Sequence, residues 1–257
     1  MLDNNQIEKN RENFIALLKR IDREGAEINR LIAKLDSSDF FFAPATAMYN
    51  NAYEGGLCEH SLQVYSIMAK IIDSLYPNER IEQREDEIDE EYNERVTSLI
   101  NSGCTVKVGN YLYKINHNRP SDNSILITAL LHDVSKMNFY EETVINKKYY
   151  SKFGKKQDEI GKFDWVSEKG YKVKSADERF VFGTKGQNSA YIIGYYIPLT
   201  LEETVAITQG TSTETMDAFG NVNLGEIMSK YPLATLLHSA DMIATYNLQH
   251  RSEEDYE

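Results

Sequence analysis

The spacing of apolar residues predicts a mainly helical chain. Over residues 6–35, apolar side chains recur mostly three, four or seven positions apart, which is typical of an amphipathic helix. Residues 57–75 have an apolar face and are followed by Pro77, which ends a helix. Residues 124–137 are nearly all apolar and predict a buried helix. Further helices are expected over residues 188–197, over residues 201–208, and from Pro232 to about His250.

Other segments alternate between apolar and polar residues, which predicts strands. Residues 105–115 alternate around Gly109-Asn110 and predict a short hairpin. Residues 140–182 interleave aromatic residues, lysines and glycines, and predict a β arm of two or more strands. The acidic segment 79–95 is interpreted as a solvated helix or a mobile connection in preference to an interaction site.

These elements predict one domain over residues 1–257. Residues 1–50 are expected to form its N-terminal helix and loop, and residues 140–182 a β arm inserted within it. The expected architecture is therefore a helical core with small β-hairpin insertions.

The charge of the chain limits which partners it can have. The 28 Lys and Arg residues against 40 Asp and Glu residues give a formal net charge of −12. A chain this acidic repels a phosphate backbone, so binding to long nucleic acid is not expected. A small anionic substrate remains compatible, because a bound metal can invert the local field.

The cysteine content and the apolar runs indicate a cytoplasmic location. Cys58 and Cys104 are too few for a disulfide framework in a chain of 257 residues, which is typical of a reducing compartment. We find no apolar run of about 18 residues, so no membrane span is expected. The first residues also lack the basic start and apolar stretch of a secretion signal.

Two histidines and two aspartates on the predicted apolar helices are candidate metal ligands. They are His60, His132, Asp133 and Asp241. An unpaired buried carboxylate is costly, so two of them beside inward histidines call for a cation. Imidazole and carboxylate ligands suit one divalent ion among Mn, Fe, Ni, Co, Zn and Mg. A hydrogen-bonded His–Asp pair in the core is the simpler interpretation for any one histidine, but the set of four favours a metal.

Three motifs that contain these residues resemble those of the HD-domain metal-dependent phosphohydrolases. They are Gly55-Gly56-Leu57-Cys58-Glu59-His60-Ser61, then Ala129-Leu130-Leu131-His132-Asp133-Val134-Ser135-Lys136, then Leu237-His238-Ser239-Ala240-Asp241. The resemblance covers roughly residues 50–250. It is closest to the HD proteins of phages and prophages, which share a β arm after the His-Asp motif.

This resemblance implies an all-α bundle with one divalent metal ion held by His60, His132, Asp133 and Asp241. It also implies hydrolysis of phosphate esters by a water that the metal activates. Asp133 and Lys136 are then the candidate catalytic residues, and Lys136 and Lys185 are candidates to bind substrate phosphate. A cation near a helix end is an equal alternative for Lys136, and an exposed loop residue is the favoured alternative for Lys185. Glu59 is a candidate general base, although a solvated carboxylate is favoured.

The chain departs from many relatives at two histidines that support a second metal. Their Gly-His-Gly-x-x-Ser stretch is replaced by Thr184-Lys185-Gly186-Gln187-Asn188-Ser189, and a later histidine before glycine is replaced by Gln209. We therefore expect one metal ion, and a catalytically silent protein remains an alternative.

The leading hypothesis is a cytoplasmic phosphohydrolase for a nucleotide or a similar small phosphate ester, acting in the host cytoplasm if a phage encodes it. A nuclease for short single strands and a catalytically degenerate HD module that binds a nucleotide or a protein are the alternatives. Lysines and aromatic residues in the arm over residues 140–182 could hold phosphates and bases. Packing of the arm on the bundle or on a second subunit, and hence a homo-oligomer, is the favoured interpretation.

Overall fold

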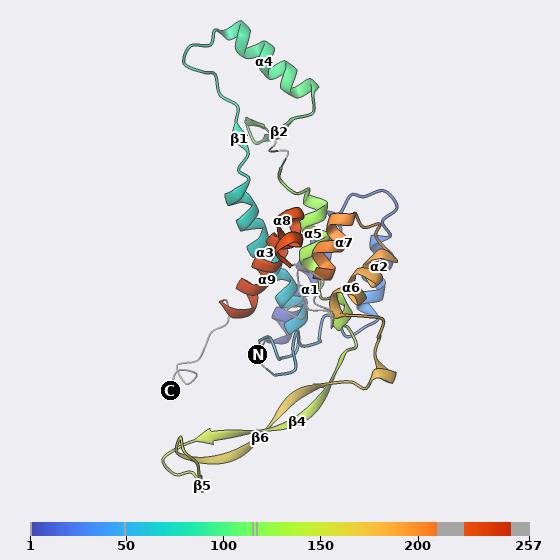
Figure 1. Cartoon of the computed structure of the whole chain (residues 1–257), viewed down its shortest axis with the longest axis vertical. Helices are drawn as coiled ribbons and strands as arrows, with labels where there is room; N and C mark the ends of the chain where they lie inside the picture. Colours follow the sequence, from blue (N-terminus) through green and yellow to red (C-terminus); the bar gives the residue numbers. More distant parts are fainter. Residues whose placement is uncertain (1, 49, 115, 117, 210–223, 248–257) are drawn as a thin grey trace.

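Helices from both ends of the chain pack around α3 (Gly56–Leu75), as Figure 1 shows. The structure is a computed structural model that describes residues 2–48, 50–114, 116, 118–209 and 224–247. The helices in contact with α3 are α1 (Asn4–Leu18), α5 (Asp122–Leu131) and α9 (Pro232–Tyr246). α7 (Leu201–Gln209) contacts α5, α9 and α6 (Lys185–Gly194), while α8 (Leu224–Lys230) contacts α9. The helices predicted near these positions are confirmed, except that α8 was not expected.

α3 and α5 each contribute to two clusters of buried apolar side chains. The first cluster contains Leu57 and Leu130 together with Phe14 of α1. The second contains Val64 and Ala129 together with Leu237 of α9. Burying one such side chain stabilises the fold by about 1.5–3 kcal/mol. Both helices are therefore held from two sides, which fixes the positions of the polar residues that they carry.

The helix predicted over residues 124–137 ends earlier than expected. Ser121 caps the start of α5 by accepting a hydrogen bond from the Ser124 backbone N–H, and α5 ends at Leu131. Asp133 then leaves the helical conformation, with φ −106° and ψ 14°, before the short 3₁₀ turn η1 (Val134–Lys136). The apolar run ends at Leu131, where α5 ends, and polar residues follow, with Val134 as the exception up to Lys136, so the predicted end at residue 137 was placed too late.

The single N-terminal helix predicted over residues 6–35 is wrong. The chain forms α1 and a separate helix, α2 (Ile28–Asp36), with a connection that the apolar spacing did not reveal. Gly25 in this connection has φ +77°, a conformation that disfavours other residues and ends helical geometry. The Glu27 backbone N–H donates to the Tyr196 carbonyl after α6, so α2 is anchored to the body instead of continuing α1.

Two small antiparallel sheets project from opposite ends of the helical body (Figure 1). The first comprises β1 (Glu79–Arg80), β3 (Tyr111–Lys114) and β2 (Thr105–Val108) in this order, and α4 (Asp89–Asn101) lies beyond it. The second is the β arm, which comprises β4 (Tyr140–Tyr150), β6 (Lys162–Val173) and β5 (Lys156–Gln157). A second 3₁₀ turn, η2 (Ala176–Glu178), leads from the arm to α6. The hairpin and the arm predicted from alternation are confirmed.

The all-α fold class with small β-hairpin insertions is wrong. About 50% of the residues are helical and 15% lie in strands of two sheets, so the chain is mixed α and β. The prediction underestimated the strands because it treated residues 105–115 as a short hairpin and the arm over residues 140–182, with two or more strands, as a small insertion in an all-α fold. Each gains a third strand instead, and the arm strands reach 11 and 12 residues.

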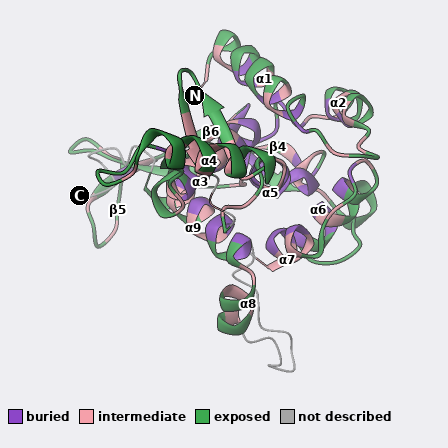
Figure 2. Ribbon diagram, turned by 90° about the horizontal axis from the view of Figure 1, so that it is seen from above, coloured by how far each residue is buried: buried purple, intermediate pink, exposed green. Residues whose placement is uncertain are grey.

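Burial separates the helical body from the two projections (Figure 2). Purple buried positions concentrate on the helices around α3, whereas α4 has no buried residue. The acidic segment therefore includes a solvated helix, as expected. Among the described residues, we find no helix with the length and apolar content that membrane crossing requires.

Candidate metal centre

His60 lies in the first turns of α3 because two glycines allow this helix to start close to the preceding loop. Gly55 has φ +82°, which a residue with a side chain rarely adopts. A Cβ atom on Gly56 would overlap the carbonyl oxygen of Asn51. The His60 side chain is consequently buried, with 5% of the residue exposed. The Gly-Gly pair in the first motif thus has a structural role in placing the histidine.

His132 lies at the end of α5, and its orientation is fixed by its own helix. Nδ1 is 2.9 Å from the carbonyl oxygen of Ala129. A carbonyl only accepts hydrogen bonds, so Nδ1 carries the proton and Nε2 has a free lone pair. Nε2 is buried and has no hydrogen-bond partner among the described residues. A buried polar atom without a partner is rare, and a lone pair in this state fits a metal ligand.

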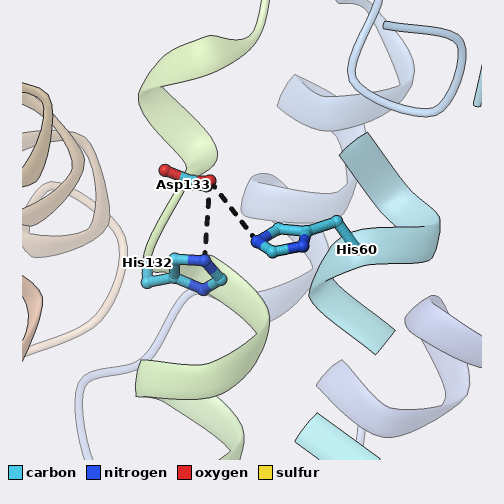
Figure 3. Close-up of side chains that lie close together, drawn as sticks. All are labelled: His60, His132 and Asp133. Carbon is cyan, nitrogen blue, oxygen red and sulfur yellow. Dashed lines mark ion pairs between the residues drawn. The ribbon is translucent and has the colours of Figure 1, made fainter. Parts of the chain in front are cut away.

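Asp133 completes a buried group of three that could hold a metal ion (Figure 3). Its Oδ2 atom lies 3.5 Å from Nε2 of His132 and 3.8 Å from Nε2 of His60. Ligand atoms at about 2.1 Å from one ion lie about 3.0–3.4 Å apart for octahedral or tetrahedral angles. The observed separations are only slightly larger, so the donor set fits a small divalent cation.

Asp241 approaches the same place from α9, which packs against α3. Its Oδ1 atom lies 3.1 Å from Nε2 of His60 and accepts a hydrogen bond from Thr245 Oγ1 at 3.3 Å. Its side chain is 20% exposed, compared with 9% for Asp133. The structure therefore places His60, His132 and Asp133 close enough to share one ion, and it places Asp241 next to His60 on the more open side, outside this group of three.

Lys136 already balances part of the negative charge of this group. Its Nζ atom donates to Asp133 Oδ2 at 2.6 Å, and its side chain is 12% exposed. Burial alone would raise the pKa of Asp133, but the nearby charge of Lys136 and its hydrogen bond to Asp133 oppose burial, and that pKa lies below its usual value. For Lys136, the attraction of Asp133 outweighs burial and raises its pKa. Both groups are therefore charged at neutral pH.

Burial and hydrogen bonding also act on the remaining ligands. Burial lowers the pKa of His132, which keeps its imidazole neutral and able to bind a cation. Burial would raise the pKa of Asp241, but the hydrogen bond from His60 outweighs it and lowers that pKa. A neutral imidazole beside two carboxylates is the protonation state that metal binding requires.

Lys185 lies at the start of α6, next to the turn that carries Lys136. Ser135 Oγ donates to the Lys185 carbonyl at 3.0 Å and accepts from Ser189 Oγ at 3.0 Å. The Lys185 side chain is exposed. The end of α7 lies close to the first turn of α6. The closeness is seen at Gly186, where a Cβ atom would overlap the carbonyl oxygen of Ile207. The segments that contain the two histidine replacements, Lys185 and Gln209, therefore meet.

Sequence reasoning missed the contacts that surround the motif residues. Glu59 accepts a hydrogen bond from the Tyr53 hydroxyl at 2.5 Å, so this carboxylate has a partner in the preceding loop. Burial and the nearby Glu59 raise the pKa of Tyr53, which keeps its hydroxyl a donor. A loop contact of this kind has no periodic signal. By contrast, the bond between His132 and Ala129 follows from helical i, i−3 spacing and could have been foreseen.

Of the remaining histidines, the structure describes one. His238 lies on α9 in a partly exposed position, one turn before Asp241. His117 and His250, which were expected at the surface, lie outside the described residues.

Comparison of the chain with models of protein families, with curated proteins and with solved structures returns no match.

Proposed function

We propose that the chain is a metal-dependent phosphohydrolase of the HD superfamily that acts on a nucleotide or a similar small phosphate ester. The observation that carries this proposal is the buried group of His60, His132 and Asp133, with Asp241 beside His60. Within the described part of the chain, the buried Nε2 of His132 has no hydrogen-bond partner. The order and spacing of the three sequence motifs add support, because each motif supplies a residue to the same place.

A divalent cation bound to His60, His132, Asp133 and Asp241 would supply a Lewis acid that polarises phosphate oxygens and lowers the pKa of water to about 7. The protein contributes the surroundings. The Ala129 carbonyl holds the His132 ring in the tautomer that presents Nε2. The two carboxylates balance the cation, and the apolar clusters on α3 and α5 exclude solvent from the buried side.

Lys136 is the residue that we assign to the substrate phosphate. Its ammonium group is charged, largely buried and within one helical turn of the ligand pair. Once a cation shares Asp133, the remaining N–H donors of Lys136 are free to bind a phosphate oxygen, a charge-assisted contact. Lys185, exposed at the first turn of α6, is proposed as a second phosphate contact.

A small substrate and a cytoplasmic location agree with the charge and cysteine state of the chain. The net charge of −12 disfavours a long nucleic acid. Cys58 and Cys104 are both free thiols, which suits a reducing compartment.

The proposal is tested by metal analysis combined with phosphate release. The purified protein is expected to bind one equivalent of Mn, Fe, Ni, Co, Zn or Mg and to release phosphate from a panel of nucleotides. The substitution His132→Ala should abolish both, because it removes the ligand with the unpartnered nitrogen.

Asp73→Asn provides a matched control on the same helix as His60. Asp73 is exposed on α3 and pairs only at the surface with Arg119, so metal content and turnover should match the wild type. A wild-type protein that binds none of these metals when they are supplied, or a His132→Ala variant with unchanged turnover, would contradict the proposal.

One observation favours a second candidate, a catalytically silent module that binds a nucleotide or a protein partner. Lys136 Nζ lies 2.6 Å from Asp133, so a protein cation already neutralises one candidate ligand. Under this alternative, Lys136 stays bound to Asp133 and keeps a metal ion from binding to the group of candidate ligands. The protein then binds a nucleotide or a protein partner without turnover. A Lys136→Met variant distinguishes the two, because it should gain metal affinity in the silent module and lose phosphate release in the enzyme.

A further inference from the structure

β4 is the edge strand of the β arm, and beyond the buried Tyr140 no strand among the described residues pairs with its outer side. The strand order is β4, β6, β5, so β4 pairs on one side only, and it does so over 11 residues. Figure 1 shows the β4–β6 ribbon leaving the helical body, with no helix beside it. The outer side of β6 is different, because β5 covers it near the tip of the arm.

The register shows which backbone groups of β4 point outwards. Ser151 donates its backbone N–H to Lys162, and Phe139 accepts a backbone hydrogen bond from Lys174, both in the β4–β6 register. In an antiparallel pair, hydrogen-bonded residues alternate with residues whose N–H and C=O face away. Odd-numbered positions of β4 therefore bond to β6, and even-numbered positions, Val144 among them, present both groups to the open edge.

This edge lacks two of the features that usually prevent strands from pairing, although it carries charged residues on both sides of its centre. β4 contains no proline and no bulge, and its central residues Thr143, Val144, Ile145 and Asn146 are uncharged. Val144 is 70% exposed and Tyr149 is 56% exposed, although both types favour strands. A two-stranded ribbon in water is marginally stable without further strands or packing. An additional strand along β4 would therefore increase the stability of the two-stranded part of the arm.

The charges along β4 are complementary to a second copy of β4 in the antiparallel direction. Glu141 and Glu142 lie near the body, whereas Lys147 and Lys148 lie towards the tip. Antiparallel pairing about Val144 sets Glu141 opposite Lys147, and pairing about Ile145 sets Glu142 opposite Lys148. Each contact occurs twice in a twofold dimer. Parallel pairing would instead oppose like charges.

Existing ion pairs on the arm leave Glu141, Glu142 and Lys147 available. Lys148 is already bound to Asp158, so the charges favour pairing about Val144 over pairing about Ile145. Glu142 pairs with Lys169, Glu141 with Lys172, and Lys147 with Glu168, all on β6 and all exposed by more than a third. Exposed pairs of this kind contribute little, so they do not compete strongly with pairing to a second strand.

We propose that the open edge of β4 pairs antiparallel with β4 of a second copy of this chain, and that the two arms form one continuous sheet across a twofold axis. The two helical bodies then lie at opposite ends of the paired strands, which span roughly 34 Å at about 3.4 Å per residue. The proposal concerns assembly and does not depend on the proposed activity.

A proline substitution tests the backbone part of the proposal. Val144→Pro removes an outward N–H without removing a bond to β6, so the hairpin should persist while the edge is blocked. Sedimentation of the full chain should give a dimer for the wild type and at least about a tenfold weaker dimer for this variant. Ser167→Pro is the matched control on the outer edge of β6 and should leave the dimer unchanged.

A mixing experiment tests the pairing partner directly. The variant Lys147→Glu/Lys148→Glu makes β4 wholly acidic, and Glu141→Lys/Glu142→Lys makes it wholly basic. Neither should dimerise alone, because like charges then face each other, whereas an equimolar mixture should form a one-to-one heterodimer that weakens in high salt. Circular dichroism of each variant would check that the fold persists.

Three outcomes would overturn the proposal. They are a wild-type protein that is monomeric throughout the micromolar range, a dimer that is equally weakened by Ser167→Pro, and two charge variants that fail to associate on mixing. Capture of a short single-stranded oligonucleotide by a monomeric wild-type protein, lost when Lys147 and Lys148 become glutamate, would assign the arm to nucleic acid instead.

Discussion

Nε2 of His60 on α3 lies 3.1 Å from Oδ1 of Asp241 on α9, although the two residues come from the first and last motifs. This contact exists because α3 and α9 pack along the second apolar cluster. The candidate centre therefore depends on long-range packing as well as on the adjacent pair His132 and Asp133. The contribution of each ligand to metal binding can accordingly be tested separately, by substitutions in the segment that supplies it.

Asp241→Asn should weaken metal binding by at least about 100-fold, because it removes an anionic ligand from α9. Thr245→Val should have a smaller effect, about tenfold at most, since Thr245 only donates to Asp241 at 3.3 Å. Titration calorimetry with Mn²⁺ or Zn²⁺ gives both affinities. Equal affinities for Asp241→Asn and the wild type would remove Asp241 from the ligand set.

Metal should also stabilise the folded chain. The ligands come from three helical segments that meet only in the folded state, so a cation binds the native protein in preference to the unfolded one. At a free metal concentration of 100 times Kd, the free energy of unfolding should rise by about 2.7 kcal/mol. Thermal unfolding with and without EDTA measures the effect. A His132→Ala protein should show no shift, and a shift of wild-type size there would point to binding elsewhere.

Glu203→Gln should destabilise the fold by about 3 kcal/mol, because it leaves the guanidinium of Arg23 without its charged partner. Glu203 is fully buried in α7, and both its oxygens accept hydrogen bonds from Arg23 at 2.6 Å. Glu8→Gln, at an exposed pair with Arg11, is the control and should cost less than about 1 kcal/mol. Urea unfolding at neutral pH measures both.

The same pair predicts how stability depends on pH. Burial alone would raise the pKa of Glu203, but the hydrogen bonds from Arg23 outweigh it and lower that pKa below its ordinary value of about 4.5. The stabilisation is therefore fully present above pH 4.5 and is lost as the pH falls through the lower folded-state pKa. Urea unfolding at several acidic pH values should show a steeper loss of stability for the wild type than for Glu203→Gln. Parallel curves would rule out this contribution.

Two glycines of α6 should respond to alanine in opposite directions. Gly186→Ala should destabilise the chain by about 1–3 kcal/mol, because the new Cβ overlaps the Ile207 carbonyl and forces α6 away from α7. Gly194→Ala, where the added Cβ meets nothing within 4 Å, should be neutral or stabilise by up to about 1 kcal/mol. Thermal unfolding compares the two. Similar effects at both positions would show that α6 and α7 are not in tight contact.

The sequence predicted the elements whose signal is local. The apolar face of α3 and the alternation of the arm strands repeat at the period of the element, so both were located correctly. The break between α1 and α2 was missed because it depends on Gly25 and on a contact of Glu27 with the end of α6. The end of α5 was misplaced because the predicted helix was extended over Val134 and Met137, although polar residues begin at His132 directly after the last residue of α5.

The sequence predicted which residues form the candidate centre, but it did not predict which charged groups pair with one another there. The expectation that His60, His132, Asp133 and Asp241 are close relied on motif order, and their distances could not be derived from spacing. The sequence could not decide whether Lys136 pairs with Asp133, because a lysine one turn away can point either to that carboxylate or to a bound substrate. The hydrogen bond between Tyr53 and Glu59 depends on loop geometry, for which the sequence offers no rule.

α3 and α5 each belong to both apolar clusters; α3 carries His60, and His132 and Asp133 follow directly after α5. Neither cluster can loosen without moving the imidazoles relative to each other. Under the proposed function, activity and structural integrity would fail together on heating, so residual activity in a cell extract would report on the fraction of intact molecules. Under the same proposal, selection for a new substrate would act mainly on the loops and on Lys185, since the helices that position the candidate ligands have little freedom to change.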